Sequence, residues 1–142
     1  MVKLDKKILE KIITNIMYHG KKRIAYKVFL DTLNIIKKKT NKNPYLVLEK
    51  ALDNIKPAVE LKKIVVAGIS YRIPILVSDE RGIALAIKWL VFYSRKRTEN
   101  KISEKLSNEI IDASNNNGLT IKYKEELNKV ALVNRPYLKY MR

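Results

Sequence analysis

Residues 61–77, with the sequence LKKIVVAGISYRIPILV, decide the fold of this chain. Val and Ile are frequent here, Gly68 stands in the middle, and from Ile69 onward large apolar side chains recur at every second position. This period of two predicts a β-hairpin. Pro74 favours an edge strand, because proline has no backbone N–H to donate. Two strands alone are marginally stable in water, so we expect the hairpin to lie against helices or RNA.

Helical periodicity precedes the hairpin. Apolar side chains recur at helical spacing over about residues 5–18, 21–39 and 44–57. Gly20 separates the first two of these segments, and Pro44 begins the third with a residue type that is common at the first position of a helix. Three helices are therefore expected before the hairpin.

Three more helices are expected after the hairpin. Ser78, followed by two acids, is a good helix start, and residues 83–93 are apolar almost all round, so this fourth helix should be central. A fifth covers about residues 102–113, and a sixth begins near Thr120. We predict a mainly α fold, a single domain of residues 1–142 with six helices and a β-hairpin inserted between the third and the fourth.

The charge balance indicates a polyanionic partner. The chain has 142 residues, with 30 Lys and Arg against 14 Asp and Glu, and a net charge of +16. Because a compact body with this charge repels itself, we expect a surface wrapped in phosphate, which favours nucleic acid. No apolar run approaches the roughly 20 residues of a spanning helix, and no signal-peptide pattern opens the chain. No membrane partner is therefore expected.

Residues suited to catalysis or metal binding are few. The chain contains no Cys and one His, His19, which lies beside Gly20. A Ser-His-Asp arrangement could use His19, but a turn residue or an RNA-facing side chain is the favoured interpretation. Metal sites need several His, Cys or clustered acids, and the four glycines offer no phosphate-binding loop. We therefore expect no enzyme activity, no cofactor and no metal site.

Basic clusters carry the functional signal. The candidate RNA-binding residues are Lys21, Lys22, Arg23, Lys62, Lys63, Tyr71, Arg72, Arg95, Lys96, Arg97, Lys101, Lys122, Lys124 and Arg135. Cations at turns and on a ribbon can reach adjacent phosphates, and an aromatic side chain can stack on an unpaired base. The cluster from Arg95 to Lys101 is the most informative, and we expect its four cations to be exposed. The alternatives are a solvated face for residues 21–23 and packing of Tyr71 against the helices.

Several short motifs follow one another along the chain. They are Ile8, Ile12-Ile13, Gly20-Lys21-Lys22, Val28-Phe29 and Thr32; then Asp53-Asn54-Ile55-Lys56-Pro57, Ala67-Gly68 and residues 71–74; then residues 84–90, Arg95-Lys96-Arg97, Glu109-Ile110-Ile111-Asp112-Ala113 and Asn134-Arg135. In this order they resemble the family of small-subunit ribosomal protein seven, over nearly the whole chain. The resemblance implies a fold of six helices with a β-ribbon, in agreement with the periodicity.

The resemblance also implies a function. Members of the family bind the 3′ major domain of small-subunit rRNA early in assembly and organise the head of the subunit. Their hairpin and C-terminal helix reach toward the path of exit-site tRNA and mRNA, where a neighbouring small-subunit protein meets them. The implied partners are therefore rRNA, tRNA, mRNA and ribosomal proteins, and not a second copy of this chain. The implied location is the ribosome.

The chain departs from bacterial members in three places. It lacks their basic arm before the first helix, Ile64-Val65 replaces paired arginines, and the ending after Arg135 is Pro136-Tyr137-Leu138-Lys139-Tyr140. The phosphate contacts of those arginines, and the contacts of the C-terminal tip, therefore do not carry over. The lost arginines and a composition typical of AT-rich genomes favour a mitochondrial, organelle-encoded member. Plastid and bacterial cytoplasm are the alternatives.

Two other classes of protein would also account for the strongly positive net charge. A helical DNA-binding or nucleoid protein would present a recognition helix with polar base-reading residues, but residues 83–93 are apolar all round. An RNA-modifying enzyme would need a cofactor loop or a cluster of catalytic acids, and the sequence shows neither. The predicted function is therefore that of a structural constituent of the small ribosomal subunit.

Overall fold

Six α-helices and one β-ribbon make up the computed structural model, in which residues 2–140 are described. In chain order the elements are α1 (Lys6–Ile16), α2 (Lys22–Thr40), α3 (Pro44–Ile55), β1 (Val59–Val66), β2 (Ile69–Leu76), α4 (Asp79–Ser94), α5 (Ile102–Ser114), α6 (Leu119–Asn134) and the 3-10 helix η1 (Arg135–Tyr140). The predicted mainly α fold, with a hairpin between the third and fourth helices, is confirmed. No helix in this part of the chain is long and apolar enough to cross a membrane.

Local side chains start three of the helices. The Asp5 carboxylate accepts a hydrogen bond from the Ile8 backbone N–H at 2.8 Å and so caps α1. Asn43 caps α3, with Pro44 at the first helical position, and Ser78 caps α4. These caps satisfy backbone N–H groups that have no partner inside the helix.

The two strands pair antiparallel through a two-residue turn. Ala67 and Gly68 form this turn with φ angles of 53° and 80°, the left-handed conformation that the favoured two-residue hairpin turn requires. The register places Lys63 opposite Arg72. Because side chains alternate between the two faces of a strand, these two cations share one face of the ribbon and Tyr71 lies on the other.

The core receives buried side chains from all six helices, with α3, α4 and α5 at its centre. Leu48, Ile87 and Ile110 come from these three helices and are at most 1% exposed. α4 also contacts α1 and α6, so it is central, as predicted. Phe92 departs from the apolar packing expected of this helix, because it is 51% exposed.

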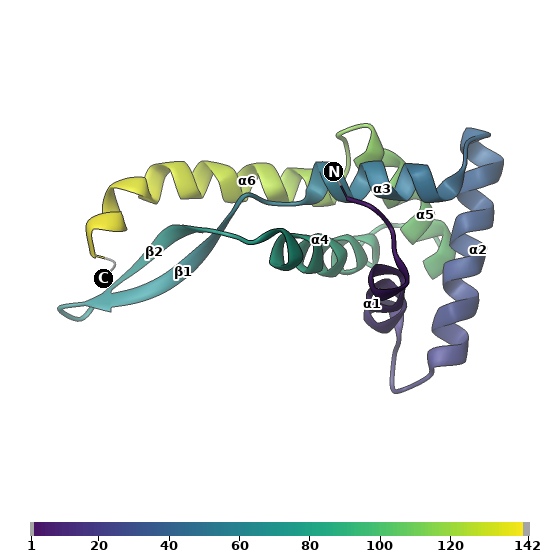
Figure 1. The fold of residues 1–142 in the computed structure, drawn as a ribbon, viewed down its shortest axis with the longest axis horizontal. Helices are drawn as coiled ribbons and strands as arrows, with labels where there is room; N and C mark the ends of the chain where they lie inside the picture. The colour runs from purple at the N-terminus through teal and green to yellow at the C-terminus, as the bar shows by residue number, and fades with distance from the viewer. Residues whose placement is uncertain (1, 141–142) are drawn as a thin grey trace.

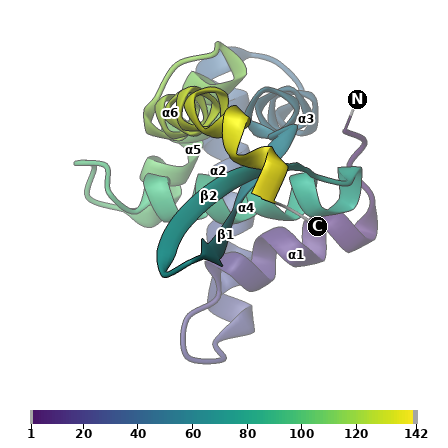
Figure 2. The same ribbon diagram turned by 90° about the vertical axis from the view of Figure 1, so that its left-hand side faces the viewer.

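The ribbon projects from the helical body with α6 running alongside it (Figure 1). Figure 2 faces the ribbon end of the molecule, where η1 folds back over β2. There the Tyr71 ring packs against the rings of Tyr137 and Tyr140, with centroids 4.8 and 4.9 Å apart. The ribbon therefore leans on α6 and η1, and Tyr71 is a packing residue of that contact.

Candidate nucleic-acid interface

Two of the predicted basic clusters meet at one hollow of the surface. The hollow has a volume of about 290 Å³ and is lined by Lys21, which precedes α2, and by Arg95, which follows α4. Tyr18 and Ile24 also line it and are 63% and 58% exposed. Cations that are far apart in the sequence therefore surround one exposed aromatic side chain.

The turn between α1 and α2 places the first cluster here. His19 and Gly20 have φ angles of 54° and 75°, and this left-handed pair reverses the chain between the two helices. His19 is thus a turn residue, as expected, and its ring packs edge-on against Tyr18 with 4.6 Å between centroids. The three cations that follow the turn are exposed, namely Lys21, Lys22 and Arg23.

Arg95 joins the end of α4 to the end of α1. Its Nη2 donates to the backbone carbonyl oxygens of Asn15 and Ile16 at 3.3 and 3.1 Å, at a helix terminus where the dipole favours a cation. Its guanidinium carbon lies 5.4 Å from the Tyr18 ring centroid, within the range of a cation–π interaction. Because Arg95 remains exposed, these contacts present a cation to solvent in a fixed position.

Lys96 and Lys101 extend the basic surface around the loop after α4. The Lys96 ammonium lies 4.5 Å from the Phe92 ring centroid and 5.4 Å from that of Tyr93. Lys101 is exposed and stands directly before α5. Since Phe92 is half-exposed, a cation and an aromatic face are presented together, which suits contact with a phosphate and a base.

Arg97 does not belong to this exposed surface, so the expectation that all four cations of its cluster are exposed is wrong. Its Nη1 donates to Glu109 at 2.8 Å and to Asp112 at 2.9 Å, and its Nη2 lies 3.1 Å from Glu99. Burial would lower the pKa of Arg97, but the hydrogen bonds to these carboxylates outweigh burial and raise the pKa. These three acids hold the side chain inside the protein, where its role is structural.

Lys124 is also engaged within the protein. Its ammonium donates to the backbone carbonyl oxygen of Asn54 at 2.7 Å, and burial lowers its pKa. The Asn54 side chain in turn donates to the carbonyl oxygens of Ala113 and Ser114 at 2.9 and 3.1 Å. These bonds tie α6 to α3, and α3 to the end of α5, so the Lys124 ammonium is directed inward.

The remaining candidates do not line the hollow. Tyr71 is held in its contact with Tyr137 and Tyr140. The other five are exposed on the ribbon, on α6 and at the start of η1, namely Lys62, Lys63, Arg72, Lys122 and Arg135. The structure therefore brings Lys21 together with Arg95 at this hollow, and brings Lys62 of the ribbon together with Arg135 at another hollow of about 910 Å³.

Sequence reasoning missed two aromatic side chains of this surface. Tyr18 stands three positions before Lys21, on the other side of the turn between α1 and α2. Phe92 stands four positions before Lys96 at the end of α4, a spacing that brings two side chains together on a helix. An aromatic residue just ahead of a basic cluster at a helix end was the available signal. Within residues 2–140, no group of three His, Cys, Asp or Glu side chains is placed to hold a metal ion.

A mainly helical body with an inserted ribbon and a cation-lined hollow is typical of a protein that binds a polyanion. The family profile described as ribosomal protein S7p/S5e matches residues 1–135. The chain belongs to this family.

Bacterial proteins named small ribosomal subunit protein uS7 are similar to the chain. That of Mycoplasma mycoides subsp. mycoides is 46% identical over 136 residues, which cover 96% of this chain and 88% of the relative. That of Acetivibrio thermocellus is 45% identical over 134 residues, covering 94% and 86%. That of Leptospira biflexa is 42% identical over 138 residues, covering 97% and 88%.

Family membership establishes the broad function. The protein is a structural ribosomal protein of the small subunit and acts in translation. The family implies rRNA and small-subunit ribosomal proteins as partners, and it does not favour the DNA-binding alternative. Because the relatives named above are bacterial, they do not support the expectation of a mitochondrial member.

Proposed function

We propose that this protein binds the 3′ major, or head, domain of small-subunit rRNA through an exposed surface that we call the basic corner. Its residues are Tyr18, Lys21, Lys22, Arg23, Arg95, Lys96 and Lys101. One observation carries the proposal: cations from the start of α2 and from the end of α4 converge on Tyr18 at one hollow. Through this contact the protein organises the assembly of the head.

The chemistry of the basic corner suits RNA. Each Lys or Arg that contacts a phosphate releases condensed counterions, so its six cations predict a slope of roughly −4 to −5 for the logarithm of affinity against the logarithm of salt concentration. Tyr18 and Phe92 add exposed rings beside those cations, and an unpaired base can stack on such a ring.

The other candidates divide into two groups. The exposed ones make secondary phosphate contacts, namely Lys62, Lys63, Arg72, Lys122 and Arg135. Arg97, Lys124 and Tyr71 act indirectly, because each holds two parts of the chain in place.

The ribbon and α6 serve the path of exit-site tRNA and mRNA and meet a neighbouring small-subunit protein. The ribbon projects from the helical body (Figure 1), and near its tip Val65 and Ile69 are 63% and 56% exposed. Apolar tips lose water readily and pack on bases or on a protein, whereas an rRNA anchor needs charge. A mitochondrial ribosome stays a prediction.

The proposal is tested by binding the full chain to an rRNA fragment of the head domain. The test variant carries glutamine at Lys22, Arg23, Lys96 and Lys101, which are exposed. Arg95 is kept, because it also caps α1. We expect an affinity loss of about 100-fold or more at moderate salt, because several phosphate contacts are removed together.

A matched control variant shows whether the loss of affinity comes from the basic corner or from the lower net charge of the protein. It carries glutamine at Lys3, Lys7, Lys88 and Lys129, four exposed lysines elsewhere, and should lose less than about tenfold in affinity. Circular dichroism confirms that both variants are folded. Equal losses in the two variants would contradict the basic corner, and equal affinity of the protein for duplex DNA at the same salt would contradict rRNA binding.

A further inference from the structure

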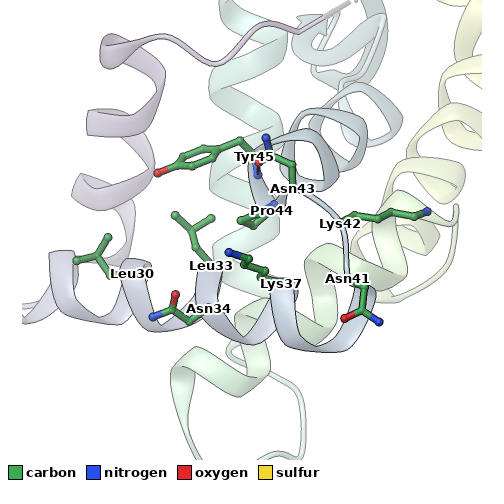
Figure 3. Close-up of a pocket in the computed structure, with 9 residues that line it drawn as sticks. All are labelled: Leu30, Leu33, Asn34, Lys37, Asn41, Lys42, Asn43, Pro44 and Tyr45. Atoms are coloured by element: carbon green, nitrogen blue, oxygen red, sulfur yellow. Dashed lines mark hydrogen bonds between the residues drawn. The ribbon is translucent and has the colours of Figure 1, made fainter.

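A second groove lies at the turn between α2 and α3, and it contains none of the candidate RNA-binding residues. Its volume is about 760 Å³, within the range of sites that bind small molecules or single nucleotides. Figure 3 shows its two sides, which are Leu30, Leu33, Asn34 and Lys37 from α2, and Pro44 and Tyr45 from α3.

The walls of this α2–α3 groove combine apolar side chains with lysine and asparagine side chains. Tyr45 is 42% exposed and Leu30 is 40% exposed. In Figure 3 the Tyr45 ring lies across the groove from Leu33. A flat ring held at a helix start can stack on any nucleobase, because every base has a π-face.

Cations border the groove. Lys37 and Lys42 line it, and Lys42 and Lys50 line an adjoining groove of about 360 Å³. Among the described residues, no Asp or Glu lines either groove. In Figure 3, Lys37 extends toward the start of α3, and Lys42 points outward from the turn.

Helix stability does not account for all of these cations. Lys37 lies in the last turn of α2, where the helix dipole favours a positive charge. Lys42 follows the C-cap of α2, where the dipole of that helix favours a positive charge, and precedes the N-cap of α3, where the dipole of α3 disfavours one. The two dipoles oppose each other at Lys42, so they do not fix its position.

We propose that the α2–α3 groove binds an unpaired nucleotide of RNA, with the base stacked on Tyr45 and the neighbouring phosphates against Lys37 and Lys42. The Asn34 side-chain amide both donates and accepts hydrogen bonds, as the edge of a base requires. A peptide would also cover the apolar wall, but cations without acids favour a polyanion.

The groove and the basic corner stand at opposite ends of α2. Lys21 of the basic corner and Lys37 of the groove are 16 residues apart along this helix, so a rise of 1.5 Å per residue separates these two cations by roughly 24 Å. One nucleotide cannot reach both cations, so the groove takes a nucleotide other than those at the basic corner. The protein then contacts RNA at two places whose separation is set by α2. This inference goes beyond the proposed function and does not require the basic corner to be the rRNA anchor.

The first experiment locates the contact. The probe is a short single-stranded oligouridine that carries 5-iodouridine, a photoreactive base that crosslinks to aromatic side chains on which it stacks. It is mixed with the full chain carrying the four basic-corner substitutions, so that binding at the other site is weakened. After irradiation, mass spectrometry should identify Tyr45 as a crosslinked residue.

The second experiment measures the contribution of each group. Tyr45→Ala should weaken oligouridine binding by about 5- to 100-fold, the loss expected for one base–aromatic stack, and Tyr45→Phe should keep the affinity because the ring remains. Lys37→Gln with Lys42→Gln should make the log–log salt slope shallower by about 1.4. Lys88→Gln with Lys129→Gln is the charge-matched control and should leave that slope nearly unchanged.

Unchanged affinity in Tyr45→Ala, or a crosslink that maps away from the groove, would overturn the proposal. Binding of an apolar peptide at Tyr45 in place of the oligouridine would also overturn it and assign the groove to a protein partner. A persistent Tyr45 crosslink together with failed binding of the head-domain fragment by the unsubstituted protein would count against the proposed function alone.

Discussion

Arg97 and Glu109 form a 2.8 Å ion pair at which three parts of the chain meet. Glu109 is fully buried on α5, and its Oε1 accepts hydrogen bonds from the backbone N–H and the hydroxyl of Thr120 at 2.9 and 2.8 Å. Thr120 lies in the first turn of α6, where an anion satisfies unpaired N–H groups. One carboxylate therefore joins the loop after α4, the middle of α5 and the start of α6.

Loss of the cation from this pair should destabilise the protein. Arg97→Gln leaves the Glu109 carboxylate buried without a counter-charge, which should cost about 3–5 kcal/mol of unfolding free energy. Lys96→Gln, at the exposed neighbouring position, should cost less than about 0.5 kcal/mol. Urea unfolding followed by circular dichroism at neutral pH measures both. Similar costs for the two variants would contradict a structural role for Arg97.

Acid should weaken the same network through Glu99. Burial would raise the pKa of Glu99, but hydrogen bonds involving its own backbone, Asn108 and Arg97 outweigh burial and hold the pKa below its ordinary value of 4.5. Such a carboxylate contributes stability above its unfolded-state pKa and loses that contribution as the pH falls through the folded-state pKa. Below pH 4.5, the unfolding free energy of the unsubstituted protein should therefore fall more steeply than that of Glu99→Gln. Parallel curves in urea unfolding would contradict this assignment.

Two glycines with positive φ should respond differently to alanine. Gly20 has a φ of 75°, and an added Cβ would meet no atom within 4 Å, whereas at Gly118, with a φ of 98°, it would lie 2.9 Å from Glu109 Oε1. Gly20→Ala should cost about 1 kcal/mol, the penalty of a left-handed backbone. Gly118→Ala should cost about 1–3 kcal/mol more, because its backbone region is closed to other residues and Glu109 must move. Thermal unfolding compares them, and equal shifts in Tm would show that Glu109 moves aside freely.

Shortening the turn around Ala67-Gly68-Ile69 should distinguish two proposed roles of the ribbon, which are anchoring to rRNA and contact with the path of tRNA and mRNA. Lys63 and Arg72 remain in the shortened ribbon, so subunit assembly should be nearly intact, while reading-frame maintenance or retention of deacylated tRNA at the exit site should suffer. Subunit yield on a sucrose gradient, beside a frameshift reporter, measures both. Failed head assembly with an unchanged reporter would instead identify the ribbon as an rRNA anchor.

Much of the fold follows from signals that are local in the sequence. Pro44 and Ser78 were expected to start helices, and Pro44 is the first residue of α3 while Ser78 caps α4. The hairpin was predicted over residues 61–77, and its strands occupy residues 59–66 and 69–76. Caps, turns and the spacing of apolar side chains depend on neighbouring residues, so the sequence alone predicts them.

The features that sequence reasoning missed depend on tertiary contacts. Arg95, Lys96 and Arg97 look alike in the sequence, but the packing of α4 against α5 directs Arg97 to Glu109 and leaves the other two exposed. Lys124 turns inward for the same reason, because α6 lies against the end of α3. Convergence of Lys21 with Arg95 at one hollow likewise depends on how α1 packs against α4.

Lys63 lies opposite Arg72 in the strand pair. Because of this pairing, ionic strength should have opposite effects on the order of the free ribbon and on its binding to RNA. Like charges directly opposite each other weaken a strand pair, and dissolved ions screen that repulsion, so the free ribbon should become more ordered as electrolyte is added. The same ions compete with the protein for RNA and weaken the complex. In the proposed complex, a phosphate between the two cations would stabilise the strand pair as dissolved ions do in solution. We therefore expect the strand pair to be loosest in dilute buffer without RNA and best ordered in the complex with RNA.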